Sequence, residues 1–189
     1  MGSEMCIRDS AHFGFRLKGD SDALDKYVDV MQRHNIALSV SLDCKLGQVE
    51  PHKQFLYEKY EDRFLLFAHI DFLGEGDPEK PNEKPIACHQ PGFVRDVCEQ
   101  IRDANSKGVV GIKLFKQFGL GYRGPDGKLL KIDDPQWDPI WETCGQLKMP
   151  VIIHTGDPAA FFDPIDASNE RYEESVSYTH LTLPTIYSV

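Results

Sequence analysis

The chain lacks the features that would place it in a membrane or on a nucleic acid. No apolar run approaches the roughly 20 residues that a membrane-spanning helix needs, and the first residues contain no apolar signal core. Positive charge is scarce, since 21 Lys and Arg face 30 Asp and Glu and leave a net charge of −9. Because a phosphate backbone is bound by clustered Lys and Arg, we expect no nucleic-acid partner, no membrane partner and a cytoplasmic protein.

Paired cysteines and a phosphate-binding motif are also missing. The cysteines are Cys6, Cys44, Cys88, Cys98 and Cys144. They are odd in number and none forms a Cys-x-x-Cys pair, which favours a reducing compartment where thiols pack as small hydrophobic groups. The one glycine-rich candidate, Gly119-Leu-Gly, lies in a predicted loop and not at a strand-to-helix turn.

Both ends of the chain differ from the rest. Residues 5–10 and 176–189 resemble short translated sequencing-adapter segments. The second stretch switches abruptly from acidic residues to Thr, Ser and β-branched residues, a composition typical of an aggregation-prone strand. We therefore expect residues 1–10 and 176–189 to be non-native tails, and the fold prediction is restricted to residues 11–174.

Predicted strands and helices alternate between those ends. Short apolar runs rich in β-branched residues predict strands at 36–42, 64–72, 109–115 and 151–154. Apolar residues at helical spacing predict a helix capped by Ser21 and further helices that begin at Pro51, near Phe93 and at Asp134. Gly108 is expected to follow the end of the third helix.

This alternation predicts an α/β protein with a parallel sheet built from βαβ units. The strands are continuous apolar runs, as expected when both faces of a sheet are covered. A (β/α) barrel and a doubly wound open sheet produce the same alternation, so the pattern alone leaves both open.

A histidine follows the last predicted strand. In Val151-Ile-Ile-His154, the imidazole lies at the carboxyl end of an apolar run. That end carries the catalytic groups in barrels, and neutral imidazole is a common zinc ligand. The alternative is that His154 simply hydrogen-bonds a neighbouring loop.

A second histidine, His12, precedes the apolar stretch 13–16, which we predict to be the first barrel strand. Alternate residues of a strand point the same way, so a metal site here would use residues i and i+2. These positions hold Ser10 and His12. Taken alone, they favour the alternative that His12 is merely a frayed terminal residue.

Three longer motifs of the chain resemble those of a known family. They are Gly111-Ile-Lys-Leu-Phe-Lys116, Met149-Pro-Val-Ile-Ile-His-Thr-Gly-Asp-Pro158 and Asn169-Glu-Arg-Tyr-Glu173. With these motifs the chain resembles the amidohydrolase-related family of the metal-dependent hydrolase superfamily over nearly all of residues 11–174. The resemblance implies a TIM-like (β/α) barrel, truncated to about its first five β/α units, that binds one or two divalent metals, commonly zinc.

The resemblance also implies roles for single residues. The usual metal ligands of the family are a His-x-His on strand 1, a His on strand 5, often a His on strand 6, and an Asp on strand 8. His12 matches the second strand-1 histidine and His154 matches the strand-5 ligand, whereas Ser10 stands where the first histidine is expected. The strand-6 and strand-8 positions, including the Asp that would act as general base, have no counterpart here.

Other polar residues are candidates for further roles. Lys113 lies in the Gly-x-Lys of the predicted fourth strand, where some superfamily members bridge two metals with a carboxylated lysine. We favour instead an ammonium paired with a carboxylate, with an electrostatic role for Lys113 or Lys116. His69 is interpreted as structural. The candidates for substrate contacts are Arg16, Lys116, Asp157, Asn169 and Arg171.

These observations predict a fragment of a metal-dependent hydrolase that uses metal-activated water on a small-molecule substrate, or of a decarboxylase of the same family. Catalytic zinc has about three protein ligands, so with two histidines the fragment itself is expected to be inactive. The alternative is a non-catalytic, doubly wound α/β binding or signalling domain, in which Asp43 and Asp71 mark a small-ion or phosphoacceptor pocket.

Overall fold

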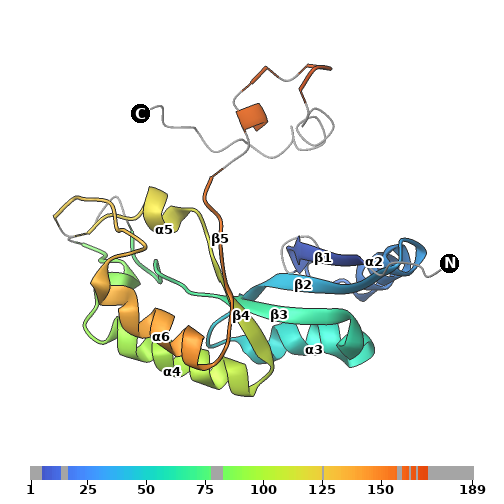
Figure 1. The fold of residues 1–189 in the computed structure, drawn as a ribbon, viewed down its shortest axis with the longest axis horizontal. Helices are drawn as coiled ribbons and strands as arrows, with labels where there is room; N and C mark the ends of the chain where they lie inside the picture. Colours follow the sequence, from blue (N-terminus) through green and yellow to red (C-terminus); the bar gives the residue numbers. More distant parts are fainter. Residues whose placement is uncertain are drawn as a thin grey trace. The chain divides into compact units, whose positions relative to one another are not determined.

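The structure, a computed structural model, describes residues 6–13, 17–77, 83–124, 126–156, 159–161, 163–164 and 166–169 (Figure 1). For residues 6–11 it describes the backbone alone. The chain divides into two compact units, Met1–His154 and Thr155–Val189. In the described part of the chain, no helix is long and apolar enough to cross a membrane.

The first unit contains a parallel, curled sheet in which the sequence order of the strands is also their spatial order (Figure 1). Its strands are β1 (Cys6–Ala11), β2 (Ile36–Lys45), β3 (Phe64–His69), β4 (Val109–Leu114) and β5 (Val151–Ile153). Each strand pairs in parallel with the next. This order is compatible with a segment of a barrel wall, whereas a doubly wound sheet reverses its order at a switch point.

Helices cover one face of the sheet. The longer ones are α2 (Ser21–Arg33), α3 (Val49–Tyr60), α4 (Phe93–Ser106) and α6 (Asp138–Gln146). The short elements are α5 (Gln117–Leu120) and the 3₁₀ turns η1 (Glu61–Arg63), η2 (Ala87–His89), η3 (Pro135–Trp137) and η4 (Ala159–Phe161), the last in the second unit. The mixed α/β class with a parallel sheet is therefore as predicted.

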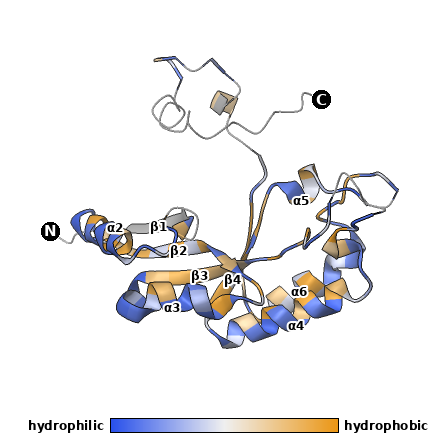
Figure 2. Ribbon diagram, turned by 180° about the vertical axis from the view of Figure 1, so that it is seen from behind, coloured by the Kyte–Doolittle hydropathy of each residue, from blue (hydrophilic) through white to orange (hydrophobic). Residues whose placement is uncertain are grey.

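The main hydrophobic core lies between the sheet and the four long helices. Its fully buried side chains include Leu24 of α2, Leu56 of α3, Ile101 of α4 and Ile140 of α6, all packed with residues of the strands. The opposite face of the sheet carries a much smaller cluster of Val40, Leu42 and Phe67. Figure 2 shows the apolar stretches of β3 and β4 and the polar, blue stretches of α3 and α4.

The helix ends follow from local hydrogen bonding and backbone geometry. We expected Ser21 to cap α2, but the cap is Asp20, whose carboxylate accepts from the backbone N–H of Asp22 and Ala23 at 2.9 and 3.2 Å. A carboxylate one residue earlier reaches the free N–H groups of the first turn, so Ser21 becomes the first helical residue. Gly108, with φ of 98°, follows α4 as predicted for a glycine after a helix.

The first strand differs from the prediction. We expected it within residues 13–16, but β1 runs from Cys6 to Ala11, and the backbone of Phe13 is helical. The Phe13 ring is only 1% exposed and packs edge-on against Tyr27 and Phe64, with centroids 4.9 and 5.1 Å away. The apolar side chain of Phe13 therefore belongs to the helix-covered core. Residues 6–10, expected to belong to a tail, supply most of the strand, and His12 follows it.

Candidate functional site

The helix-free face of the sheet carries polar side chains towards the carboxyl ends of its strands. Successive residues of a strand point to opposite faces, and Leu66, Ala68 and Ile112 belong to the helix-covered core. Phe67 and His69 on β3, and Gly111 and Lys113 on β4, therefore point the other way. We call this the inner face, defined by Val40, Leu42, Phe67, His69 and Lys113.

A hydrogen bond joins the ends of β1 and β2. Nδ1 of His12 lies 2.5 Å from Oδ1 of Asp43, and the side chains are 40% and 14% exposed. Because the carboxylate can only accept, Nδ1 of His12 donates in this hydrogen bond, and in the neutral ring this tautomer leaves the lone pair on Nε2. Carboxylates that fix a histidine ring in this way are the usual outer partners of metal-binding histidines.

An aromatic ring lies beside His12 and also beside His69. The Phe115 ring stacks on His12 with centroids 6.0 Å apart and planes at 24°. It meets the His69 ring at a centroid distance of 5.3 Å and an angle of 67°. His12 just after β1, His69 at the end of β3 and Phe115 just after β4 thus gather at one end of the sheet.

One ring nitrogen of His69 lacks a hydrogen-bond partner within the described part of the chain. Burial lowers the pKa of the imidazole, although the carboxylates of Asp43 and Asp71 act in the opposite direction. Nδ1 is buried and has no hydrogen-bond partner among the described residues. A purely structural histidine would be expected to have both ring nitrogens paired, so the structural interpretation of His69 does not account for its environment.

Asp71 is engaged in an ion pair at the same end of the sheet. Its carboxylate lies 2.7 Å from Nζ of Lys45 and accepts a 2.8 Å hydrogen bond from the backbone N–H of Gly74. Burial alone would raise the pKa of Asp71, but the Lys45 ammonium and the Gly74 N–H outweigh it and lower that pKa. Asp71 is therefore an ionised, structurally committed carboxylate.

Lys113 is a buried cation of the inner face. Its side chain is 7% exposed, and it stands opposite His69 on β3 and Ile152 on β5. Burial lowers the pKa of its ammonium. We expected this ammonium to pair with a carboxylate. No carboxylate of the described residues lies in an ion pair with it; Asp43 is bonded to His12 and Asp71 to Lys45, so the pairing of Lys113 stays a prediction.

Comparison with known families adds to this geometry. The amidohydrolase family model matches residues 54–183, more than half of the chain, and includes β3, β4 and β5. The chain belongs to the amidohydrolase family. No curated protein and no solved structure matches it.

In this amidohydrolase, His154 directly follows β5. Its backbone N–H donates to the carbonyl of Leu114 at 3.0 Å, so it continues the pairing of β5 with β4. His154 is half-buried and lies within the family match, at the same carboxyl end as Phe115. Both predicted metal ligands thus follow strands, His12 after β1 and His154 after β5.

The other predicted site residues are only partly described. Lys116 precedes α5 as its N-cap residue. Asn169 lies in the second unit, where its side-chain amide donates to the carbonyls of Ala160 and Pro164 at 2.8 and 3.0 Å. The three remaining candidates lie outside the described residues: Arg16, Asp157 and Arg171.

A complete metal centre is not formed by the described residues alone. Among them, no three His, Cys, Asp or Glu side chains lie together in a way that could hold a metal ion. Catalytic zinc sites have about three protein ligands. The donor chemistry of His12, Asp43 and His154 suits a divalent cation, but their arrangement does not fit a finished ligand set.

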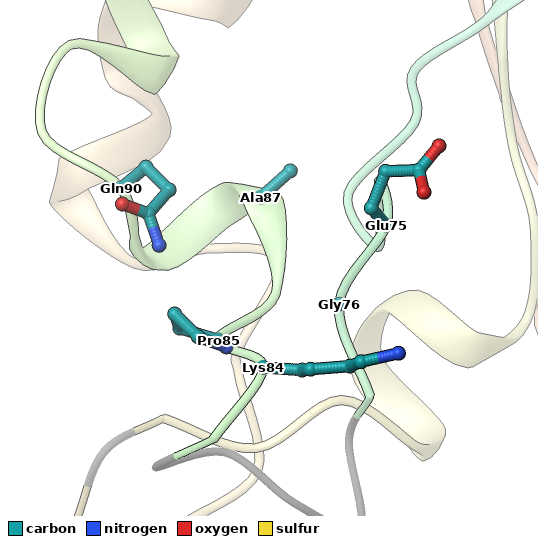
Figure 3. Close-up of a pocket in the computed structure, with 6 residues that line it drawn as sticks. All are labelled: Glu75, Gly76, Lys84, Pro85, Ala87 and Gln90. Atoms are coloured by element: carbon teal, nitrogen blue, oxygen red, sulfur yellow. The ribbon is translucent and has the colours of Figure 1, made fainter.

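Two pockets of this amidohydrolase lie in the loops that follow β3 and β4. One, of about 440 Å³, separates two arms of the loop after β3, with Glu75 and Gly76 on one arm and Lys84 on the other (Figure 3). The second, of about 740 Å³, lies between the start of α4 and residues 124–136. Neither pocket is lined by the histidines of the inner face.

Sequence reasoning gave Asp43 a role only in the alternative of a small-ion or phosphoacceptor pocket and interpreted His69 as structural, so neither was predicted for this site. His12 and Asp43 are 31 residues apart, and their pairing depends on the strand order. A signal for His69 was present, because it ends an apolar run in the same way as His154 does. Applying the strand-end rule to every strand would have found it.

Proposed function

We propose that this chain is part of a metal-dependent hydrolase that acts on a small-molecule substrate by metal-activated water. A decarboxylase of the same family is the variant of this proposal. Membership of the amidohydrolase family supports the hydrolase chemistry. The observation that carries the metal dependence is the His12–Asp43 hydrogen bond, because it leaves Nε2 of His12 as a ligand nitrogen at the carboxyl end of the sheet.

The proposed ligands in this chain are His12 and His154, and the proposed metal is zinc. The remaining ligands would come from outside the described residues, in an eight-stranded barrel of which the present sheet forms the first five strands. Lys113 and Lys116 would supply positive charge near the site. Substrate contacts are proposed for Arg16, Lys116, Asp157, Asn169 and Arg171. With two ligands, this chain alone is expected to have little or no hydrolase activity.

The proposal is tested by titrating the metal-free chain with zinc and measuring the binding by calorimetry. Weak binding is expected for the unaltered chain, and both His12→Ala and His154→Ala should lower the affinity about tenfold or more, since each removes one ligand. Ser10→His places a second imidazole two residues before His12 and should raise the affinity by about tenfold or more. His34→Ala is the matched control, because His34 is an exposed residue at the end of α2.

Two results would contradict the proposal. One is zinc binding that is absent from the unaltered chain and also from the Ser10→His variant. The other is binding that survives unchanged in His12→Ala and His154→Ala, since the zinc would then be held by other residues.

A further inference from the structure

We propose that Lys113 and His69 form a binding site on the inner face for the carboxylate group of a small-molecule ligand. The inference deepens the proposed function and depends on it in one respect, namely that the ligand is taken to be the substrate of the hydrolase. It assigns to that substrate a class, a small carboxylic acid in its ionised form.

The first observation is the burial of Lys113 without a countercharge. The residue is 7% exposed, and no hydrogen bond or ion pair joins its ammonium to any described residue. Nζ itself is not among the fully buried atoms that lack a partner, so the tip of this side chain reaches the open side of the inner face. A ligand that brings a negative charge to this face would pair with the ammonium.

The second observation is that the neighbouring carboxylates already have partners. Asp43 accepts from the His12 ring, and Asp71 forms the 2.7 Å ion pair with Lys45. Asp71 also holds the backbone of Gly74, so its position is fixed by two contacts. The positive charge of Lys113 is therefore not cancelled by the acidic residues at this end of the sheet.

The third observation concerns the residue opposite Lys113. His69 and Lys113 are paired in register on adjacent parallel strands, so their side chains leave the sheet side by side on the inner face. Nδ1 of His69 is buried and unpartnered within the described part of the chain. A ligand bound to Lys113 would therefore lie beside the His69 ring, whose Nδ1 lacks a partner among the described residues.

The surroundings of this pair are apolar. Ile152 stands opposite Lys113 on the other side, and Phe67 and Phe115 lie along the same face of β3 and β4. Gly111, one position before Lys113 on this face, leaves room for the Phe67 ring, which would lie 2.3 Å from a Cβ atom there. In such a low-dielectric setting the attraction between an ammonium and a carboxylate is stronger than in water.

The chemistry of the two side chains selects an anion. An ammonium has three donors and no acceptor, so it repels a cation and gains more from a carboxylate than from a neutral amide. The ligand must be small, because the pair occupies one position on each of two neighbouring strands. These features together specify an ionised carboxylate.

The inference is tested by titrating the metal-free protein with sodium acetate. Calorimetry or chemical-shift changes measure the binding. Acetate is expected to bind, whereas acetamide, its neutral isostere, should bind at least about tenfold more weakly. Lys113→Met should lower the acetate affinity by about tenfold or more, and Lys113→Arg should retain most of it. His69→Phe should lower the affinity about threefold, since it removes one hydrogen-bonding atom.

The matched control is Lys128→Met, because the Lys128 side chain is 85% exposed on a loop. It should leave acetate binding unchanged. Equal acetate affinity in Lys113→Met and the unaltered chain would overturn the inference, as would a complete absence of acetate binding. Tighter binding of inorganic phosphate than of acetate, lost in Lys113→Met, would overturn the assignment of a carboxylate.

The acetate titration and the zinc titration test the carboxylate site and the proposed function separately. Zinc is absent from the acetate titration, and neither Lys113 nor His69 is altered in the zinc titration. Acetate binding without any zinc binding would support the carboxylate site and contradict the metal-dependent hydrolase. Zinc binding that depends on His12 and His154, without acetate binding, would do the reverse.

Discussion

The buried ammonium of Lys113 is expected to reduce the stability of the unliganded chain. Its pKa is lowered by burial, so the unfolded chain binds the lysine proton more tightly than the folded chain does. The free energy of unfolding should therefore rise with pH between the lowered pKa and the ordinary value of 10.5, as the folded-state penalty disappears. Lys113→Met should raise that free energy by about 1 kcal/mol at neutral pH.

Chemical denaturation at several pH values measures this effect. The stability difference between Lys113→Met and the unaltered chain should shrink as the pH rises towards 10.5. Lys128→Met, at an exposed lysine, should show no such trend. A Lys113→Met variant that is less stable at neutral pH would argue against an uncompensated buried charge. The expected gain also means that lost acetate binding in this variant would not reflect unfolding.

Gly111 is required by the packing of the inner face. A Cβ atom at this position would lie 2.3 Å from Cζ of Phe67, with two further ring atoms at 2.4 and 2.6 Å. Gly111→Ala should therefore destabilise the chain by about 1–3 kcal/mol, as expected for overpacking. Thermal or urea denaturation measures the change, and adding Phe67→Leu should restore part of the loss.

Gly145→Ala is the matched control for Gly111→Ala. Gly145 lies within α6, and a Cβ atom there would meet nothing within 4 Å. This substitution should raise the stability by about 0.5–1 kcal/mol, because it reduces the entropy of the unfolded chain. Equal effects of the two substitutions would show that the contact with Phe67 does not limit position 111.

Single residues differ in how far the sequence reveals their roles. Lys113 and His154 were identified because a charged or polar side chain in an apolar strand is costly without a partner. The nature of the partner was not predictable, since it depends on which carboxylates reach Lys113 in space. Asp43 could not be paired with His12 until β1 was known to lie beside β2.

Among the secondary-structure elements, α2 depends on its cap at Asp20. The carboxylate accepts two backbone hydrogen bonds in the first turn, from Asp22 and Ala23. Asp20→Ala should lower the free energy of unfolding by about 1 kcal/mol. Asp29→Ala, at an exposed residue of the same helix, should change it by less than about 0.5 kcal/mol. A smaller loss for Asp20→Ala than for Asp29→Ala in urea denaturation would contradict this role.

The elements themselves were largely predictable, but their ends were not. The helix-covered apolar stripes of α2 and α4 follow helical spacing, so both helices could be placed from the sequence. β2 continues to Lys45, three residues beyond its predicted end, because pairing with β3 extends past the apolar run. β1 was misplaced because its residues carry no clear apolar pattern, and its strand state comes from pairing with β2.

For the molecule as a whole, the strand order bears on a choice that the alternation of elements left open, between a barrel and a doubly wound sheet. The sequential order β1 to β5 and the shared core of the four long helices are compatible with part of a barrel wall. Strands and helices alternate along the chain in the same way in a barrel and in a doubly wound sheet. The alternation gives the order of the elements in the sequence, but not which strands are neighbours in the sheet. This order therefore weakens the alternative of a doubly wound binding or signalling domain.

An open sheet also has edges, and these should govern the association of the chain. In the described sheet, β1 and β5 each pair with a single neighbour. Ile153 on β5 is 38% exposed, so an apolar side chain lies on an edge strand that presents unpaired backbone groups. Such an edge is a template for pairing with another chain, and we expect the protein to self-associate as its concentration rises.

Ile153→Lys should reduce this association, because a charged side chain on an edge strand opposes strand pairing between molecules. Sedimentation velocity over a range of concentrations measures the associated fraction. Val30→Lys makes a matched control, since Val30 is 37% exposed on α2, away from the sheet edge, and acquires the same charge. If the two variants reduced association equally, net charge would be the cause. A chain that stayed monomeric without either substitution would show that the β5 edge is not available to other molecules.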